Sequence, residues 1–266
     1  ASSSLSPLDS AKRAAAFAAV DTHVKPNMRH IGIGSGSTVV YAVERIVAQG
    51  SELNKSRLFV PTSLQAKTLI IEGGTCAALT AGLHLADVDT CPELDIVIDG
   101  ADEYLRNNAS VDLALNLIKG GGACHLQEKV IAESSKEMVV VADYRKMSKV
   151  LGDGWTKGVP IEVAPFAAQK ALTRIRQLGS TDAHIRMGIA KAGPVVTDNG
   201  NLCIDAVFPQ AVMRNPDHLL RQLKLITGVV EVGLFNGLCQ VGYFGMADGT
   251  VTKQTRDGTY ETIGSK

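Results

Sequence analysis

The sequence has no surplus of charge of either sign, and its apolar runs are short. Lysine and arginine number 27 and aspartate and glutamate number 27, so the formal net charge is zero. A protein that binds nucleic acid through the phosphate backbone needs excess positive charge on one face, so we expect no nucleic-acid partner. The longest apolar runs, such as IVI and VVV, are far too short to cross a bilayer. We therefore expect no membrane partner either.

Several sequence motifs are also missing. The cysteines are odd in number and have no CxxC spacing, which argues against a disulfide framework and a structural zinc site. Reduced thiols of this kind favour a cytoplasmic protein. No GxSxG or HExxH motif occurs, so the acyl-transfer and zinc-hydrolase routes that use them have no support. The cysteines are Cys76, Cys91, Cys124, Cys203 and Cys239.

The first half of the chain alternates between strand and helix patterns. Residues 30–34, HIGIG, predict a short strand, and apolar residues recur at helical spacing in 38–50, TVVYAVERIVAQG. Further strands and helices follow in the same alternation as far as 137–147, EMVVVADYRKM. This order predicts an α/β domain whose mostly parallel sheet is covered on both faces. We place this domain at residues 1–150 plus 236–266, with the tail returning to the first sheet through a hairpin at Asp248–Gly249.

The second half has a different rhythm. A strand at 159–165 and a helix at 166–179 precede a hairpin signal, Asn199–Gly200, that leads into a further strand. A helix at 216–228 and a final strand, VVEVGLF, complete the order. The succession β-α-β-β-α-β is the split βαβ pattern of ferredoxin-like α+β domains. We place this smaller domain at residues 151–235.

A glycine- and serine-rich turn follows the first strand. It comprises Gly32, Ile33, Gly34, Ser35, Gly36, Ser37 and Thr38. The turn lacks the Walker lysine, and Ser37 stands where the dinucleotide fingerprint has its third glycine. What remains is a loop of hydroxyl groups and N–H groups at a helix start, which suits one phosphate or carboxylate group. A tight strand-to-helix turn with capping hydroxyls is the alternative interpretation.

An acidic turn follows the strand DIVI. Asp99, Asp102 and Glu103 lie within five residues, so their charges repel one another and burial costs solvation. Such clusters bind metals, recognise hydroxyl groups or transfer protons, and a divalent-metal site is a competing interpretation because hard cations prefer oxygen ligands. A solvated acidic turn is a further interpretation, and Glu103 in particular is expected to face solvent. The pattern alone leaves these open.

A glycine triplet, Gly120–Gly122, forms the third turn. Lys119 precedes it, and Glu128 lies in the helix that follows. Glycine triplets cost backbone entropy unless something must approach the backbone closely. Because ligand sites of open parallel sheets gather at the carboxyl ends of the strands, we expect the three turns to converge. Glu128 alone is the type of residue that usually lies in solvent, and only its neighbours suggest a function. His125 and Cys124 are expected to be structural.

At these residues the sequence resembles ribose-5-phosphate isomerase of type A, specifically its longer eukaryotic-type members. The matching blocks run in order from about Ala11 to the end and cover nearly the whole chain. They are GIGSGSTVVYAVERI, VPTSLQA, DIVIDGADE, LNLIKGGGACHLQEKVIA, VVVADYRK, GVPIEVAPFA, AGPVVTDNGN and GVVEVGLF. The resemblance implies a Rossmann-like catalytic domain and interconversion of D-ribose 5-phosphate and D-ribulose 5-phosphate in the pentose phosphate pathway, without metal or cofactor.

The resemblance also implies roles for individual residues. Glu128 would be the general base, and Asp99, Asp102 and Lys119 would surround the reactive end of the sugar. Substrate-binding positions would be Ser35, Gly36, Ser37, Thr38, Gly100, Ala101, Gly120, Gly121 and Gly122, with Lys146 and Lys12 at the phosphate end. A homodimer or homotetramer is implied as well. The chemistry agrees, because one carboxylate with access to C1 and C2 moves a proton between them while a lysine stabilises the enediolate oxygen.

Two other classes compete with this interpretation. Related folds serve as sugar-phosphate sensors in transcription regulators, but the zero net charge and the lack of a helix-turn-helix segment before Ile31 argue against a sensor. Coenzyme A transferases have a similar fold and use a nucleophilic glutamate. Covalent labelling by an acyl-CoA would distinguish a transferase from an isomerase.

Overall fold

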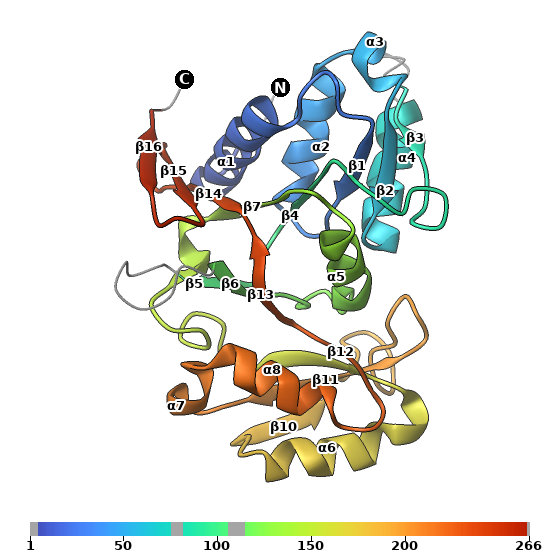
Figure 1. Cartoon of the computed structure of the whole chain (residues 1–266), viewed down its shortest axis with the longest axis vertical. Coiled ribbons are helices and arrows are strands. Elements are labelled where there is room, and N and C mark those ends of the chain that lie inside the picture. Colours follow the sequence, from blue (N-terminus) through green and yellow to red (C-terminus); the bar gives the residue numbers. More distant parts are fainter. Residues whose placement is uncertain (1–4, 76–81, 106–114, 265–266) are drawn as a thin grey trace. The chain divides into compact units, whose positions relative to one another are not determined.

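The chain forms two compact units, each made from separate stretches of sequence. The structure, a computed structural model, describes residues 5–75, 82–105 and 115–264. Unit 1 comprises Ala1–Gly100, Glu128–Arg145 and Leu238–Lys266, and unit 2 comprises Ala101–Gln127 and Lys146–Gly237 (Figure 1). The chain therefore passes from one unit to the other at several points, among them Gly100–Ala101 and Gln127–Glu128.

The described residues of unit 1 form an eight-stranded sheet in the order β16-β15-β14-β7-β4-β1-β2-β3. Within this sheet, β14, β7, β4, β1, β2 and β3 run parallel to one another. Strands β15 and β16 are added at the edge next to β14 and pair antiparallel. The strands are β1 (His30–Ile33), β2 (Leu58–Pro61), β3 (His84–Leu85), β4 (Ile96–Asp99), β7 (Met138–Asp143), β14 (Val241–Gly245), β15 (Val251–Thr255) and β16 (Tyr260–Ile263). The helices are α1 (Pro7–His23), α2 (Val39–Ala48), α3 (Ser51–Asn54), α4 (Leu64–Thr75) and α5 (His125–Glu133), which starts in unit 2.

The central strands of this sheet are buried along their whole length. Every residue of β4 and β7 is buried, as expected for parallel strands that are covered on both faces. Helix α5 packs directly against β1 and β4, since a Cβ at Gly32 would lie 2.8 Å from both Ile131 Cγ2 and Val97 Cβ. The expected return of the tail is confirmed, because β14 pairs with β7 and turns through Asp248–Gly249 into β15.

Unit 2 contains two four-stranded sheets among its described residues. The first has the order β10-β11-β9-β12 and is antiparallel, with the succession of strands and helices that the sequence predicts. The second has the order β13-β6-β5-β8. The elements are β5 (Glu103–Leu105), β6 (Leu115–Ile118), η1 (Tyr144–Lys146), β8 (Met147–Ser148), β9 (Val159–Val163), η2 (Pro165–Ala167), α6 (Ala168–Gln177), β10 (Asp182–Ile185), β11 (Leu202–Val207), α7 (Gln210–Met213), α8 (Pro216–Lys224), β12 (Val229–Val232) and β13 (Leu234–Cys239). Of these, η1 begins in unit 1 and β13 ends in it.

The segment VVEVGLF differs from the sequence prediction of one strand. Its first part is β12, an edge strand of the first sheet, and its last part begins β13, an edge strand of the second sheet. Gly233 lies between the two strands. The Gly233 N–H donates to Pro160 O and its carbonyl accepts from the N–H of Lys119. A Cβ at this position would lie 2.2 Å from Lys119 O, so only glycine allows the close approach. The stretch 101–127, expected in the first domain, groups by its contacts with unit 2.

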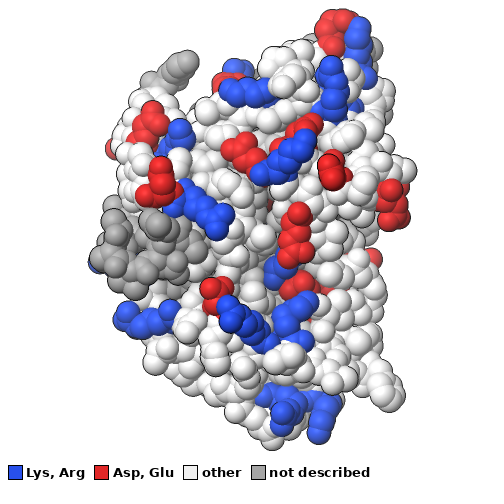
Figure 2. Space-filling model, in the orientation of Figure 1, with Lys and Arg blue, Asp and Glu red and all other residues white. Residues whose placement is uncertain are grey.

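The described cysteines are buried and form no disulfide, and Cys76 lies outside the described residues. In the described ranges, no group of three or more His, Cys, Asp or Glu side chains is arranged to hold a metal ion. Over the same ranges, no helix has the length and apolar character needed to span a bilayer. Figure 2 shows basic and acidic side chains intermingled across much of the visible face.

Candidate active site

In unit 1 the end of β4 and the loop after β1 are joined by one carboxylate. Asp99 is the last residue of β4 and is fully buried. Its Oδ1 accepts the N–H groups of Ser35, at 3.0 Å, and of Gly100, at 2.7 Å. A Cβ at Gly34 would lie 2.0 Å from the same oxygen, so the loop passes this carboxylate with no room for a side chain. Sequence reasoning expected these two turns to meet, and the geometry in unit 1 places them together.

The loop after β1 also contacts hydroxyl groups at the end of β2. Ser35 Oγ lies 2.8 Å from Thr62 Oγ1 and 2.6 Å from Ser63 Oγ, and the Gly36 N–H donates to Gln65 Oε1. These three partners belong to the segment VPTSLQA, whose side chains the sequence analysis did not assign. The signal available for them was their place directly after a parallel strand, at the edge where ligand sites gather.

The tip of the same loop is open to solvent. Gly36 has a φ of 105°, a backbone conformation in which glycine is favoured, and a Cβ there would meet nothing within 4 Å. Ser37 is exposed, whereas Thr38, immediately before α2, is buried. A small anion therefore has access to the tip of this loop, where Ser37 carries an exposed hydroxyl group.

Glu128 lies in the first turn of α5 and is only 4% exposed. It shares a helix face with Ile131, three residues later, and Ile131 packs on β1 and β4. The far end of α5 lies beside the amino end of β4, because the Leu94 N–H donates to Ser134 O. Helix α5 must therefore begin near the carboxyl ends of the strands, the edge that contains Asp99 and Ser35.

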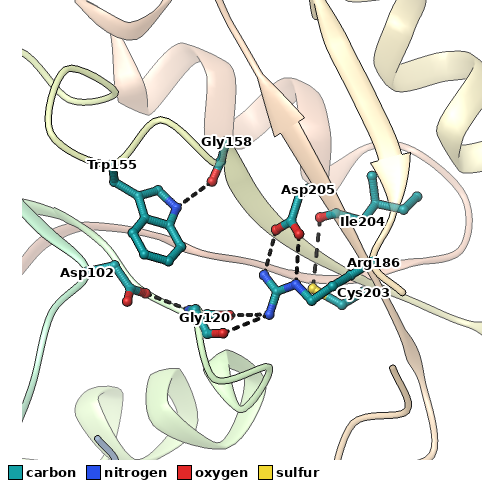
Figure 3. A network of polar contacts seen from close by, with 9 residues as sticks. Asp102, Gly120, Trp155, Gly158, Arg186, Cys203, Ile204 and Asp205 are labelled. Carbon is teal, nitrogen blue, oxygen red and sulfur yellow. Dashed lines mark hydrogen bonds and ion pairs between the residues drawn. The ribbon is translucent and has the colours of Figure 1, made fainter. Parts of the chain in front are cut away.

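In unit 2 the acidic turn lies beside the glycine triplet. Strand β5 pairs with β6 so that Glu103 is opposite Ile118, and the Asp102 N–H donates to Ile118 O. Asp102 Oδ2 in turn accepts the N–H of Gly121 at 2.6 Å (Figure 3). Gly120 has a φ of 98°, which fits the close approach of the backbone that a glycine triplet predicts.

Lys119 follows β6 directly and is 2% exposed. Its Nζ lies 5.4 Å from the centre of the Phe235 ring, and its N–H donates to Gly233 O. An almost fully buried ammonium group is costly unless it has anionic or aromatic partners, so this lysine is held in place rather than left as a mobile surface charge. The Lys119, Asp102 and glycine-triplet residues thus form one group within unit 2.

Glu103 differs from the expectation that it faces solvent. It is fully buried, and its two carboxylate oxygens accept the N–H groups of Gly152, at 2.5 Å, and Gly154, at 2.6 Å. Two backbone N–H donors satisfy the charge that burial would otherwise make costly. A freely solvated acidic turn is therefore wrong for Glu103 and for Asp99, which is buried as well.

The two lysines expected at the phosphate end lie in different units. Lys12 follows Ala11 in the chain. The Ala11 carbonyl oxygen lies so close to Gly245 that a Cβ on Gly245 would be 1.8 Å from it. Gly245 ends β14, so Lys12 lies at the carboxyl edge of the sheet, with its Nζ 3.5 Å from Asp9 Oδ1. Lys146 belongs to unit 2 and its Nζ is 5.6 Å from the centre of the Trp155 ring. Their contact with a substrate stays a prediction.

Sequence reasoning missed Arg186, which contacts the glycine triplet. The guanidinium donates to the carbonyl oxygens of Gly120, at 3.1 Å, and Gly121, at 3.0 Å, and forms an ion pair with Asp205 (Figure 3). The only signal in the sequence is a charged residue in an extended segment, HIRMG, which is too common to single out.

Comparison with known proteins gives a consistent result. A family model described as "Ribose 5-phosphate isomerase A (phosphoriboisomerase A)" matches residues 58–249. A ribose-5-phosphate isomerase of Mycosarcoma maydis is 59% identical over 254 residues, which is 96% of this chain and 84% of that protein. The chain belongs to the ribose 5-phosphate isomerase A family. Membership of this family favours an isomerase over a sugar-phosphate sensor or a coenzyme A transferase.

More distant members of the family are similar over nearly the same length. The human ribose-5-phosphate isomerase is 43% identical over 256 residues, 96% of this chain and 76% of that protein. A solved ribose 5-phosphate isomerase A from Methanocaldococcus jannaschii matches with a TM-score of 0.78 at 33% identity, covering 92% of this chain and 98% of its own. Another isomerase, solved with phospho-erythronic acid, has a TM-score of 0.78 at 34% identity and covers 93% of this chain and 99% of its own.

Proposed function

We propose that this protein interconverts D-ribose 5-phosphate and D-ribulose 5-phosphate in the pentose phosphate pathway, by proton transfer through an enediolate. The observation that supports this most strongly is Glu128, a carboxylate 4% exposed in the first turn of a helix that packs on β1 and β4. Strand β1 leads into the loop of residues 34–38, the serine loop, and β4 ends at Asp99. A family of aldose–ketose isomerases and a buried carboxylate at the carboxyl edge of a parallel sheet point to the same chemistry.

Glu128 acts as the general base in this proposal. Its carboxylate removes the proton from C2 of the open-chain aldose and returns it to C1, while the carbonyl oxygen becomes the oxygen of an enediolate. Low exposure of the base matters, because a site with little water around it protects the reactive enediolate from side reactions.

The neighbouring charges stabilise the reacting end of the sugar. Lys119, held against Phe235, provides fixed positive charge where the enediolate oxygen becomes anionic. Asp102 keeps the glycine triplet in position through the N–H of Gly121, and Asp99 exchanges a proton with the sugar hydroxyls during ring opening.

The phosphate group anchors the other end of the substrate. We assign it to residues 35–38, of which Gly36 and Ser37 are exposed, with Lys12 and Lys146 as the positive charges. The phosphate does not react, so its binding energy positions the sugar for proton transfer. Within this proposal unit 1 contains the Rossmann-like catalytic domain, and the β10-β11-β9-β12 sheet with its helices is the ferredoxin-like domain. Cytoplasmic location and assembly as a homodimer or homotetramer remain predictions.

The test is a coupled assay of ribulose 5-phosphate formation from ribose 5-phosphate, with the variants E128Q and E133Q. Glutamine keeps the shape of Glu128 but removes its basicity, so kcat should fall by about 10²-fold or more, the usual contribution of a general base. Glu133 is an exposed carboxylate of the same helix, and its variant should keep the activity of the parent chain.

Binding measurements separate chemistry from folding in this test. Ribose 5-phosphate should bind E128Q with nearly unchanged affinity, because the phosphate anchor is intact. Near-parent turnover in E128Q would remove Glu128 from the reaction, and a parent chain that does not isomerise ribose 5-phosphate would overturn the proposed function itself.

A further inference from the structure

The glycine triplet of unit 2 is held by hydrogen bonds on two opposite sides. On one side Arg186 Nη1 donates to the carbonyl oxygens of Gly120 and Gly121. On the other, Asp102 Oδ2 accepts the N–H of Gly121 (Figure 3). One side-chain nitrogen therefore binds two consecutive carbonyl groups of a loop that would otherwise have the large conformational freedom of glycine.

The direction of the carbonyl groups fixes the direction of the N–H groups. In a trans peptide the C=O and the following N–H point opposite ways. With both carbonyls directed to Arg186, the N–H groups of Gly121 and Gly122 must point away from it. The first meets Asp102, and the second belongs to an exposed residue, so a substrate oxygen has access to it. Of these two groups, the N–H of Gly122 is therefore the one left to meet a substrate oxygen, because the N–H of Gly121 is bound to Asp102.

The sheet of unit 2 holds Arg186 itself rigidly. The N–H of Arg186 donates to Cys203 O and its carbonyl accepts from the N–H of Val195, so its backbone is paired on both sides. Because Arg186 is opposite Cys203, Asp205 lies two residues along on the same face, within reach of a long side chain. Asp205 Oδ2 accepts from Nε at 2.8 Å and Oδ1 from Nη2 at 2.5 Å. The third nitrogen, Nη1, is left to bind the loop.

The charges around Arg186 support this arrangement. The side chains of Arg186 and Asp205 are 15% and 9% exposed, so the pair is largely shielded from water. Burial alone would lower the pKa of the guanidinium, but the hydrogen bonds with Asp205 raise it above its ordinary value. Burial also raises the pKa of the neighbouring Cys203 thiol to about 12. That thiol is therefore neutral and does not compete with Asp205 for the guanidinium.

We propose that Arg186, held by Asp205, is a positioning residue that fixes the glycine triplet so that the N–H of Gly122 faces the charge that develops on the reacting sugar. The inference rests on the proposed isomerase function. Donors fixed in advance stabilise a developing oxyanion without reorganisation during the reaction. Lysine cannot replace arginine here, because an ammonium group lacks the planar fork that binds a carboxylate with two nitrogens while a third reaches the loop.

The test compares two ligands in the full chain and in R186K. Phospho-erythronic acid has a planar carboxylate that resembles the enediolate at the reacting end, whereas inorganic phosphate occupies only the anchor. We expect R186K to lower kcat/KM for ribose 5-phosphate at least about 10-fold, the scale of a lost charged hydrogen bond and a displaced loop. Affinity for phospho-erythronic acid should fall by a similar factor, while the inhibition constant of inorganic phosphate changes less than about 2-fold.

Two further variants control for folding. R176K alters an arginine in the same unit that also donates to a backbone carbonyl, that of Ala183, but does not contact the loop, and it should match the parent chain. D205N keeps Arg186 but replaces its charged partner with a carboxamide of the same shape. It should therefore lower kcat/KM and the affinity for phospho-erythronic acid as R186K does. The two ligands distinguish positioning from general damage, since a loosened domain lowers affinity for both.

The outcomes separate this inference from the proposed function. An active parent chain with R186K and D205N equal to it would overturn the role of Arg186 and leave the isomerase assignment intact. Equal losses for phospho-erythronic acid and inorganic phosphate would also overturn it, because Arg186 would then support the whole domain. A parent chain without isomerase activity would instead refute the proposed function on which the inference rests.

Discussion

Two glycine-containing loops, one in each unit, follow strands and use an aspartate in the same way. In unit 1 Asp99 accepts the N–H of Ser35, and in unit 2 Asp102 accepts the N–H of Gly121. The loops differ in what lies on their other sides. The serine loop contacts the neutral hydroxyls of Thr62 and Ser63, whereas the glycine triplet contacts the guanidinium of Arg186.

This difference matches two different tasks. The tip of the serine loop is exposed and a Cβ at Gly36 would meet nothing, so a phosphate can be bound there by adjustable hydroxyl and N–H donors. A phosphate that does not react has the same charge in the ground state and the transition state, so its donors need not be aligned with a developing charge. The glycine triplet is held by the donor Arg186 on one side and by the acceptor Asp102 on the other. A loop fixed in this way suits the reacting end of the sugar, where small displacements of a catalytic group lower the rate.

The largest effect that would sharpen this comparison is expected from G121A. A Cβ at Gly121 would lie 2.4 Å from Asp102 Oδ1, so the carboxylate must move and its bond to the Gly121 N–H breaks. We expect kcat/KM for ribose 5-phosphate to fall about 10²-fold, in line with the cost of displacing a catalytic loop. Steady-state kinetics measure this, with a thermal melt to establish that the variant is folded.

The adjacent glycine provides a matched comparison for that variant. In G122A the new Cβ would contact only Cys124 Sγ, at 3.4 Å, so Asp102 can stay in place. Its loss should be several-fold smaller than that of G121A. Equal losses in the two variants would mean that crowding of the bound sugar, and not displacement of Asp102, explains the result.

A smaller effect is expected from S37A in the serine loop. The exposed hydroxyl of Ser37 contributes one donor to the phosphate, which is bound equally in the ground state and the transition state. KM should therefore rise by about 3- to 10-fold while kcat stays within about 2-fold. Ser51, at the start of α3 in the same unit, provides the control variant S51A, which should leave both constants unchanged. A fall in kcat with an unchanged KM would break the division of tasks between the two loops.

The sequence predicted the parts of the fold that depend on local pattern. Short apolar runs such as HIGIG and DIVI became β1 and β4, and the glycine that ends the run 38–50 lies just beyond α2. The single strand predicted for VVEVGLF was wrong because the close approach of Gly233 to Lys119 divides it, and that approach is a contact between distant segments. Strands of two or three residues, such as β3, β5 and β8, were not predicted either, since so few residues show no periodicity.

For the site, the sequence predicted residues at strand ends and missed those that support them. Asp99 and Ser35 were expected together because both follow parallel strands. Glu103 was expected in solvent because nothing nearby in sequence indicates Gly152 and Gly154, the partners that make its burial possible. Arg186 was missed for the same reason, since its contact with the glycine triplet joins residues more than sixty positions apart.

The central claim is that a base exchanges a proton with C2 and C1 of the sugar. The most direct measurement is prolonged incubation of ribose 5-phosphate with the protein in D₂O, followed by NMR of both sugars. Proton transfer through an enediolate predicts deuterium at C2 of ribose 5-phosphate and at C1 of ribulose 5-phosphate, with exchange slowed in E128Q as much as turnover is. Complete interconversion over many turnovers with no deuterium in either sugar would contradict proton exchange through a base and favour a direct hydride shift.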